Sequence, residues 1–229
     1  MNRLLPVTVL VVASSSFAAS TTPFAAWAKS GDDADARFCV LLGQVAVSAD
    51  AGGKLNVAGR RAASLRLVKF DMIEWLWSMP VDTDYLIAYE STNRHEDSSS
   101  GGLCRFSGDL TKRRWCIPFP AVNVAASMSS SKTVFLAGIG MVAEVDLRTG
   151  TYLWKVNGLY ERSQAFNSFF TAVERGRSVE FYAIEGGSTA KPWVATVDRA
   201  TGKLSSVREV ESLSGEALEL PRSAGLCRE

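Results

Sequence analysis

Short runs of apolar residues, some continuous and some alternating with polar ones, follow one another from residue 38 to about residue 209. Gly, Ser, Asp and Asn separate the runs, and these turn formers recur roughly every 8–12 positions, as they do between the strands of all-β proteins. No part of this region keeps the period of an amphipathic helix. The pattern predicts an all-β chain with strands over residues 39–48, 54–58, 63–69, 72–79, 84–90, 102–106, 112–118, 121–127, 133–138, 141–146, 152–157, 168–173, 178–184, 192–198 and 203–209.

A short motif occurs twice in the second half of the chain. Val-Asp-Leu-Arg-Thr-Gly at 145–150 returns as Val-Asp-Arg-Ala-Thr-Gly at 197–202, each time between two predicted strands. The side chains of Asp146 and Asp198 are expected to accept hydrogen bonds from turn amides two residues on. Gly150 and Gly202 are expected to adopt positive φ, where a Cβ would be penalised. The motif predicts a tight hairpin turn at the same place in two repeated units.

Tryptophan marks a longer period. Trp77, Trp115 and Trp154 are separated by 38 and 39 residues, and a period of about 40 with about four strands per unit is typical of β-propeller blades. Each indole is expected to pack against the neighbouring sheet and to donate its N–H to a carbonyl. The last unit is longer, since Gly202 follows Gly150 by 52 residues, and it has Ser at the place of Trp154.

These motifs resemble the repeats of quinoprotein-like, pyrroloquinoline-quinone-type β-propellers. Residues 133–156 are the clearest unit, 178–207 look like a degenerate copy, and 100–118 look like a more distant one that has Trp115 but no Thr-Gly. The resemblance implies a propeller-like array of four-stranded antiparallel blades. At roughly 40 residues per blade, the mature chain would form four or five of them, in a closed or an open arrangement.

The redox members of that family have eight blades, a cofactor pocket and calcium, and they are much longer than this chain. We therefore expect no bound cofactor and no metal, and the dehydrogenase activity of the family is not carried over. The resemblance leaves a scaffolding or binding role in the bacterial envelope.

The first 19 residues have the layout of a secretory signal: Arg3, an apolar run over 4–13, and then small residues. A second small-residue site at 26–28 allows cleavage as late as residue 28. An uncleaved membrane anchor is the alternative, although a spanning helix needs roughly 20 apolar residues, about twice this run. We expect a signal peptide over 1–19, a flexible mature N-terminus over 20–37, a propeller-like domain over 38–229, a periplasmic or secreted location, and no integral membrane span after signal removal.

Four cysteines are present, and an even number in an exported chain predicts disulfides. A hairpin centred on residue 110 would place Cys104 opposite Cys116, within disulfide reach. Cys39 and Cys227 would then join the two ends of the mature chain, which constrains the unfolded chain by about 4–5 kcal/mol. The alternative is four buried thiols.

Charge and catalytic residues narrow the possible functions. The formal net charge is +1, so no global field favours a nucleic-acid partner. His95 is the single histidine, which excludes a multi-histidine metal site, and no Gly-X-Ser-X-Gly nucleophile elbow is present. We expect no enzyme activity.

The candidate for partner binding is the polar stretch that contains Arg94, His95, Glu96 and Asp97. It is long for a hairpin connection, and long loops on rigid scaffolds often carry function. A solvated Ser/Gly-rich insertion is the alternative interpretation. A second exposed segment, with Tyr160, Arg162 and Phe166, is predicted over 157–167, and tyrosine together with arginine is typical of interface centres. The alternative is that these side chains pack between blades.

Three functions agree with these features. The first is a non-catalytic exported propeller that binds another envelope or secreted protein as a scaffold or accessory factor. The second is a periplasmic immunity or inhibitor protein that blocks a toxic envelope hydrolase. The third is a propeller that binds a small ligand or acts as an enzyme.

Overall fold

The computed structural model describes residues 25–26, 28–30, 37–42, 45–50, 54–57, 60–64, 71–93, 98–119, 127–130, 132–167, 169–184 and 191–212. Apart from one 3-10 turn, η2 (Gln164–Asn167), all the regular elements there are strands. In chain order the strands are β1 (Ala25–Ala26), β2 (Ala28–Ser30), β3 (Arg37–Leu42), β4 (Val45–Asp50), β5 (Lys54–Val57), β6 (Arg60–Ser64), β7 (Asp71–Val81), β8 (Asp84–Asn93), β9 (Ser98–Ser107), β10 (Arg113–Phe119), β11 (Ser127–Ser130), β12 (Thr133–Gly138), β13 (Met141–Asp146), β14 (Tyr152–Val156), β15 (Phe169–Arg175), β16 (Ser178–Ile184), β17 (Pro192–Asp198) and β18 (Lys203–Glu209).

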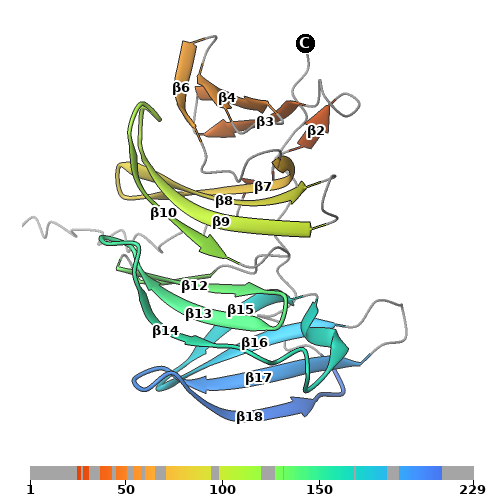
Figure 1. The fold of residues 1–229 in the computed structure, drawn as a ribbon. Helices are drawn as coiled ribbons and strands as arrows, with labels where there is room; N and C mark the ends of the chain where they lie inside the picture. The colour runs from red at the N-terminus through yellow and green to blue at the C-terminus, as the bar shows by residue number, and fades with distance from the viewer. Residues whose placement is uncertain are drawn as a thin grey trace, which may run out of the picture.

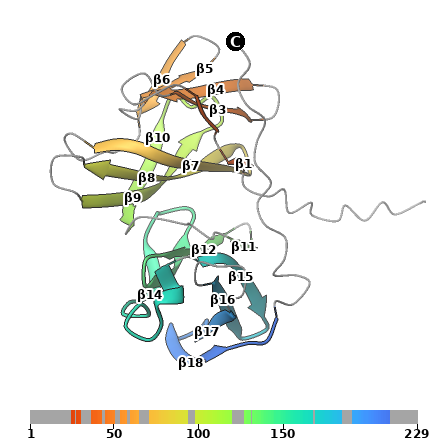
Figure 2. The same ribbon diagram turned by 90° about the vertical axis from the view of Figure 1, so that its right-hand side faces the viewer.

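The strands form four antiparallel sheets that follow the order of the chain, here called blades 1 to 4. Blade 1 is β2–β6, blade 2 is β7–β10 with β1 added beside β7, blade 3 is β11–β14 and blade 4 is β15–β18. The blades succeed one another from blade 1 at the top to blade 4 at the bottom of Figure 1. Blades 1 and 4 lie at opposite ends in both views, so the array is open (Figures 1 and 2). The fold is therefore an all-β, propeller-like array of antiparallel blades.

Blade 3 shows why the sheets stack. All residues of β12 are buried, and alternate side chains of a strand point to opposite faces of the sheet. Val134 and Leu136 pack in a cluster with Leu86 and Leu103 of blade 2. Their neighbours Phe135 and Ala137 pack in a second cluster, which includes Val179 and Phe181 of blade 4. A sheet with two apolar faces is stable only between neighbours that cover both.

From residue 133 on, the strand predictions agree with the structure, whereas the strand predicted over 121–127 shares only Ser127 with the observed β11. The predicted bounds of β12, β13, β16, β17 and β18 coincide with the observed ones. The predicted hairpin around residue 110 is also confirmed, since Cys104 pairs with Cys116 across β9 and β10 and the two form a disulfide. The second predicted disulfide, Cys39 with Cys227, lies outside the described residues because Cys227 does.

Three predictions for the first half are wrong. Residues 39–48 were predicted as one strand, but residues 39–42 and 45–48 belong to two antiparallel strands, β3 and β4, in which Leu42 pairs with Val45. The segment 20–37 contains β1 and β2, so strands begin before residue 38. Trp77 lies in β7, the first strand of the blade 2 meander, whereas Trp115 and Trp154 lie in fourth strands, so the spacing of 38 does not relate equivalent positions.

Each of the two fourth-strand indoles lies against a glycine of the next blade. A Cβ added to Gly150 would lie 2.5 Å from Cδ2 of Trp115. A Cβ added to Gly202 would overlap Cβ of Trp154 and lie 2.7 Å from its Cγ. Both glycines have the positive φ expected of them, 70° and 67°. The Thr-Gly turn therefore has two roles: it closes a hairpin of its own blade, and it packs against the indole of the preceding blade.

The contact between Gly150 and Trp115 predicts how alanine substitutions differ. Gly176 has a similar φ of 60° but no atom within 4 Å of an added Cβ, so Gly176→Ala isolates the backbone cost of about 1 kcal/mol. Gly150→Ala adds overlap with an indole in a packed junction, and we expect a loss of about 2–4 kcal/mol in the free energy of unfolding. Urea denaturation of both variants measures the difference. Equal losses would show that no indole occupies this space.

Candidate functional site: the two ends of the blades

The hairpins of the array fall into two groups at opposite ends of the strands. The turns between third and fourth strands, such as those joining β13 to β14 and β17 to β18, lie on the left in Figure 1. The connection from β14 to β15, with η2, lies on the right in Figure 1 and faces the viewer in Figure 2. We call these the turn end and the loop end. The predicted partner loop, Arg94 to Asp97, lies outside the described residues.

The described part of the loop end is anchored by buried side chains. Leu159 and Phe166 are fully buried, and they hold the 157–167 segment in the cluster between blades 3 and 4. The segment also bonds to the tight turn that joins β12 to β13: the Gly140 N–H donates to the Phe166 carbonyl at 2.9 Å, and the Leu159 N–H donates to the Gly140 carbonyl at 3.0 Å. These bonds fix the backbone of a connection that has little regular secondary structure.

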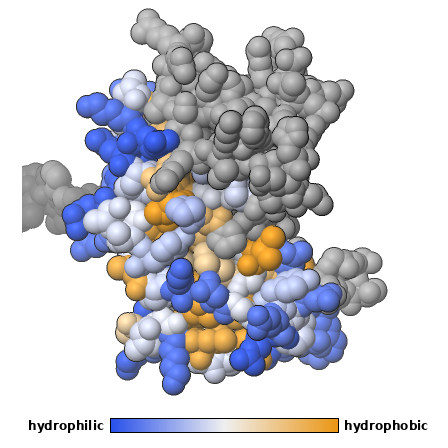
Figure 3. Space-filling view, in the orientation of Figure 1, coloured by the Kyte–Doolittle hydropathy of each residue, from blue (hydrophilic) through white to orange (hydrophobic). Residues whose placement is uncertain are grey.

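Two large apolar side chains are exposed on this anchored segment and the turn beside it. Tyr160 is 46% exposed and Ile139 is 40% exposed, and Glu161 and Arg162 next to Tyr160 are exposed as well. Phe166 of the same segment is fully buried between blades 3 and 4, as the alternative interpretation expected. On the face shown in Figure 3, apolar side chains form separate groups interrupted by hydrophilic ones. The loop end therefore offers small apolar contacts with charged neighbours.

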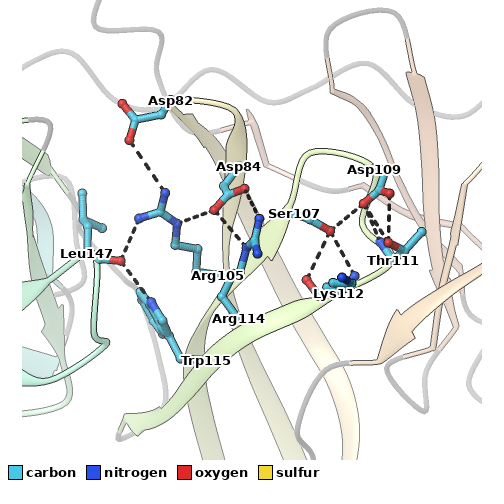
Figure 4. Close-up of polar contacts among 10 residues, drawn as sticks. All are labelled: Asp82, Asp84, Arg105, Ser107, Asp109, Thr111, Lys112, Arg114, Trp115 and Leu147. Carbon is cyan, nitrogen blue, oxygen red and sulfur yellow. Dashed lines mark hydrogen bonds and ion pairs between the residues drawn. The ribbon is translucent and has the colours of Figure 1, made fainter.

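The turn end holds a polar junction between blades 2 and 3 (Figure 4). The carbonyl oxygen of Leu147 accepts two hydrogen bonds from blade 2, one from Arg105 Nη1 at 2.8 Å and one from Trp115 Nε1 at 3.0 Å. Arg105 is itself held by the buried carboxylate of Asp84, with 2.7 Å between Nε and Oδ2. Arg114 lies on the same carboxylate at 3.4 Å, so both guanidinium groups share Asp84.

A related junction joins blades 3 and 4, with different chemistry. The side chain of Glu144 is 3% exposed, and its Oε1 accepts from Arg199 Nη2 at 2.8 Å and from Nε at 3.0 Å. Its other oxygen accepts from Trp154 Nε1 at 2.9 Å, whereas a carbonyl acceptor was predicted. Arg199 also donates to Glu174 and Thr133, and its guanidinium lies 5.4 Å from the centre of the Phe135 ring. The indole and one blade 4 side chain thus share a buried carboxylate.

The aspartates of the turns hold the turn backbone. The carboxylates of Asp146 and Asp198 accept mainly from the N–H three residues on, at Thr149 and Thr201. The backbone two residues on, at Arg148 and Ala200, where the bond was predicted, makes a smaller contribution. Hydrogen bonds from the backbone and hydroxyl of Thr149 lower the pKa of Asp146, and those from the hydroxyl and backbone of Thr201 lower the pKa of Asp198. The hydrogen bonds that form these turns therefore favour the ionised carboxylates of Asp146 and Asp198.

Asp109 has the same role in the turn between β9 and β10. Hydrogen bonds from the Ser107 hydroxyl, and from the N–H and hydroxyl of Thr111, lower its pKa to about 2. Leu110 beside it has φ 56°, so a leucine takes the left-handed conformation without a Thr-Gly pair in this turn. The distant copy at 100–118 therefore keeps the hairpin while changing the residues that make it.

The described residues contain no group of three or more His, Cys, Asp or Glu side chains that could hold a metal ion. Within the same part of the chain, no helix has the length and apolar character needed to cross a membrane. The carboxylates of both junctions are occupied by guanidinium and indole donors. Their arrangement joins blades, and it does not resemble a paired acid and base open to a substrate.

Solved structures with a similar fold include a quinohaemoprotein alcohol dehydrogenase from Pseudomonas putida HK5, with a TM-score of 0.43 and 11% identity over 76% of this chain. This chain covers 34% of that enzyme, about a third of its length. A Bacteroides caccae protein of unknown function matches over 84% of this chain and 75% of its own, with a TM-score of 0.42 and 10% identity. A GH43 β-xylosidase/α-arabinofuranosidase from a compost metagenome matches over 82% and 77%, with a TM-score of 0.41 and 10% identity.

The likeness to these proteins is one of fold alone, as the resemblance of the repeats implied. Comparison with models of protein families finds no match, and neither does comparison with curated protein sequences.

The lowered pKa of Asp109 predicts an acid-dependent contribution to stability. Its folded-state pKa of about 2 is below the value of about 3.9 for an unfolded aspartate, so the contribution is present above pH 4 and is lost as the pH falls towards 2. We expect Asp109→Asn to lower the Tm at pH 6 and to have the Tm of the wild-type protein near pH 2. Thermal melts of both proteins from pH 2 to 6 test this. A Tm difference that stays constant over this range would contradict it.

Proposed function

We propose that this chain is a non-catalytic, exported scaffold that binds another envelope or secreted protein through the loop end of its blades. The observation that carries the proposal is the anchored segment 157–167. Two fully buried side chains and two backbone hydrogen bonds hold its backbone, while Tyr160 and Arg162 face solvent. Tyrosine and arginine are enriched at the energetic centres of interfaces. An ordered segment also loses less conformational entropy on binding than a free loop does.

The division of the two ends supports the same role. The described turn end is occupied by junctions that join blade to blade, through Arg105 and Trp115 in one case and Arg199 and Trp154 in the other. The loop end carries the longer connections, and residues on such connections change function without changing the scaffold. Asn93 and Ser98 pair with each other, and we include residues 94–97, which lie between them in the sequence, in the proposed surface.

Export is supported by the disulfide between Cys104 and Cys116, because disulfides persist in oxidising compartments. The signal-like first 19 residues support the same location. These two features support our proposal of a periplasmic or extracellular location.

Site-specific photo-cross-linking in cells tests the binding surface. A photoreactive amino acid replaces Tyr160 at the loop end or His95 of the proposed surface. Arg148 at the turn end serves as the matched control because it is exposed like Tyr160. We expect one adduct of the same mass from both positions of the proposed surface and none from residue 148. Adducts from residue 148 alone, or identical adducts from both ends, would contradict the proposed surface. Tyr160→Ala with Arg162→Ala should abolish the adduct from position 95 and change the free energy of unfolding by less than about 0.5 kcal/mol.

Cell fractionation tests export independently of any partner. We expect the mature protein in the periplasmic or extracellular fraction, beginning after residue 19 or as late as residue 28. Its Cys104 and Cys116 should react with an alkylating reagent only after reduction. Full-length protein in the cytoplasm with reactive thiols would contradict an exported role, whatever the cross-linking shows.

A further inference from the structure

The two junctions at the turn end are built on the same three positions of successive blades. The first position begins the second strand and pairs with the last residue of the third: Asp84 in blade 2 and Thr133 in blade 3. The second position is on the third strand, two residues before its end: Arg105 in blade 2 and Glu144 in blade 3. The third position follows the third strand of the next blade: Leu147 in blade 3 and Arg199 in blade 4.

Each junction contains one buried carboxylate bound to a guanidinium, but the charges are distributed differently. Between blades 2 and 3, Asp84 and Arg105 both belong to blade 2, and blade 3 supplies only the carbonyl of Leu147. Between blades 3 and 4, Glu144 belongs to blade 3 and Arg199 to blade 4. Thr133, which stands where blade 2 has Asp84, accepts a hydrogen bond from Arg199 and carries no charge. Only the second junction needs a charge from the blade that follows.

Because of this difference, the face of blade 2 that contacts blade 3 and the face of blade 3 that contacts blade 4 need different residues on the following blade. We call these two faces, and the residues at the second position on them, the receiving surfaces and receiving groups. A turn with Arg199 placed on blade 2 would bring a third guanidinium to a junction in which Arg105 and Arg114 already share Asp84. A turn with Leu147 placed on blade 3 would leave the buried carboxylate of Glu144 with the Trp154 N–H but without a cation. A buried charge that loses its partner is strongly destabilising, so each mismatch opposes stacking.

The outer face of blade 4 lacks both receiving groups. Thr196 pairs with Ser206 there, as Glu144 pairs with Trp154 in blade 3, so neither a carboxylate nor an indole stands at these positions. Beside them Glu180 binds Arg175 at 3.5 Å and Arg208 at 3.8 Å, and it accepts the Tyr182 hydroxyl at 2.7 Å. The same face also carries an apolar cluster, in which Tyr182 and Val194 are buried and Val173 and Val210 pack against them. Blade 4 therefore differs from blades 2 and 3 in lacking the charged or indole group at these positions.

We propose that these positions encode the order of the blades, so that the surfaces of blades 2 and 3 each accept only the blade that follows in this chain, whereas blade 4 has no such junction residues on its outer face. The repeats share the same hairpin and, in two junctions, the same indole-on-glycine contact. Apolar packing alone would therefore leave exchange of blades with a second copy of the chain open. The position of one guanidinium distinguishes the right neighbour from the wrong one.

Transplanting one junction onto the other tests the proposal. Arg199→Leu gives blade 4 the turn residue of blade 3, and Glu144→Arg gives blade 3 the receiving residue of blade 2. We expect each single substitution to lower the Tm by about 10 °C, because each leaves a buried charge unpaired. The triple variant Thr133→Asp, Glu144→Arg, Arg199→Leu rebuilds the arrangement of Asp84, Arg105 and Leu147, and its Tm should return to within about 3 °C of the wild-type value.

A triple variant that is no more stable than the worse single variant, or that does not fold, would overturn the proposal. If the single variants do not fold, a double-mutant cycle with smaller substitutions tests the proposal instead. In a double-mutant cycle of Glu144→Gln and Arg199→Gln, the Tm losses should be non-additive, because the second substitution removes the charge that the first left alone. The control cycle of Arg105→Gln and Arg199→Gln joins different junctions and should be additive. Additivity in both cycles would also overturn the proposal.

Discussion

The contact of an indole with a glycine in the next sheet fixes how the described blades 2 to 4 stack. Trp115 and Trp154 project from fourth strands, and Gly150 and Gly202 lie against them without a Cβ. The glycine sets how closely two sheets approach, and the indole N–H adds a hydrogen bond in each case, to the Leu147 carbonyl or to Glu144. Because both glycines belong to the turn of a hairpin, the same residues shape the hairpin and position it on its neighbour.

The apolar clusters depend on that spacing. Phe135, Trp154 and Phe181 form mutual ring contacts with centroids 6.1–6.3 Å apart, two of them edge to face, and they fill the space between blades 3 and 4. With the turn ends joined in this way, the loop ends of neighbouring blades are held in a fixed relation. A binding surface made from several connections needs this fixed relation more than it needs any one loop conformation.

Much of the fold could be predicted from local pattern, and the exceptions have physical causes. β12 and β13 are apolar on both faces and bounded by turn residues, which fixes their limits from sequence. The prediction that Trp77 is equivalent to Trp115 and Trp154 was wrong because spacing does not reveal which strand of a blade carries an indole. Glu144 and Arg105 were missed as site residues, although a charge within an apolar strand was the available signal. The partner of Glu144 lies 55 residues away, and only the stacking of blade 4 brings Arg199 to it.

Hydrogen exchange of the indole N–H groups tests the stacking most directly. The chain has six tryptophans, and Trp115→Phe and Trp154→Phe variants assign two of the indole signals in a ¹⁵N NMR spectrum. We expect both N–H groups to exchange much more slowly than a solvated indole, and that of Trp115 to regain fast exchange in Gly150→Ala, where an added Cβ displaces the ring. Exchange of both N–H groups at the rate of a solvated indole in the folded protein would contradict blades joined through their indoles.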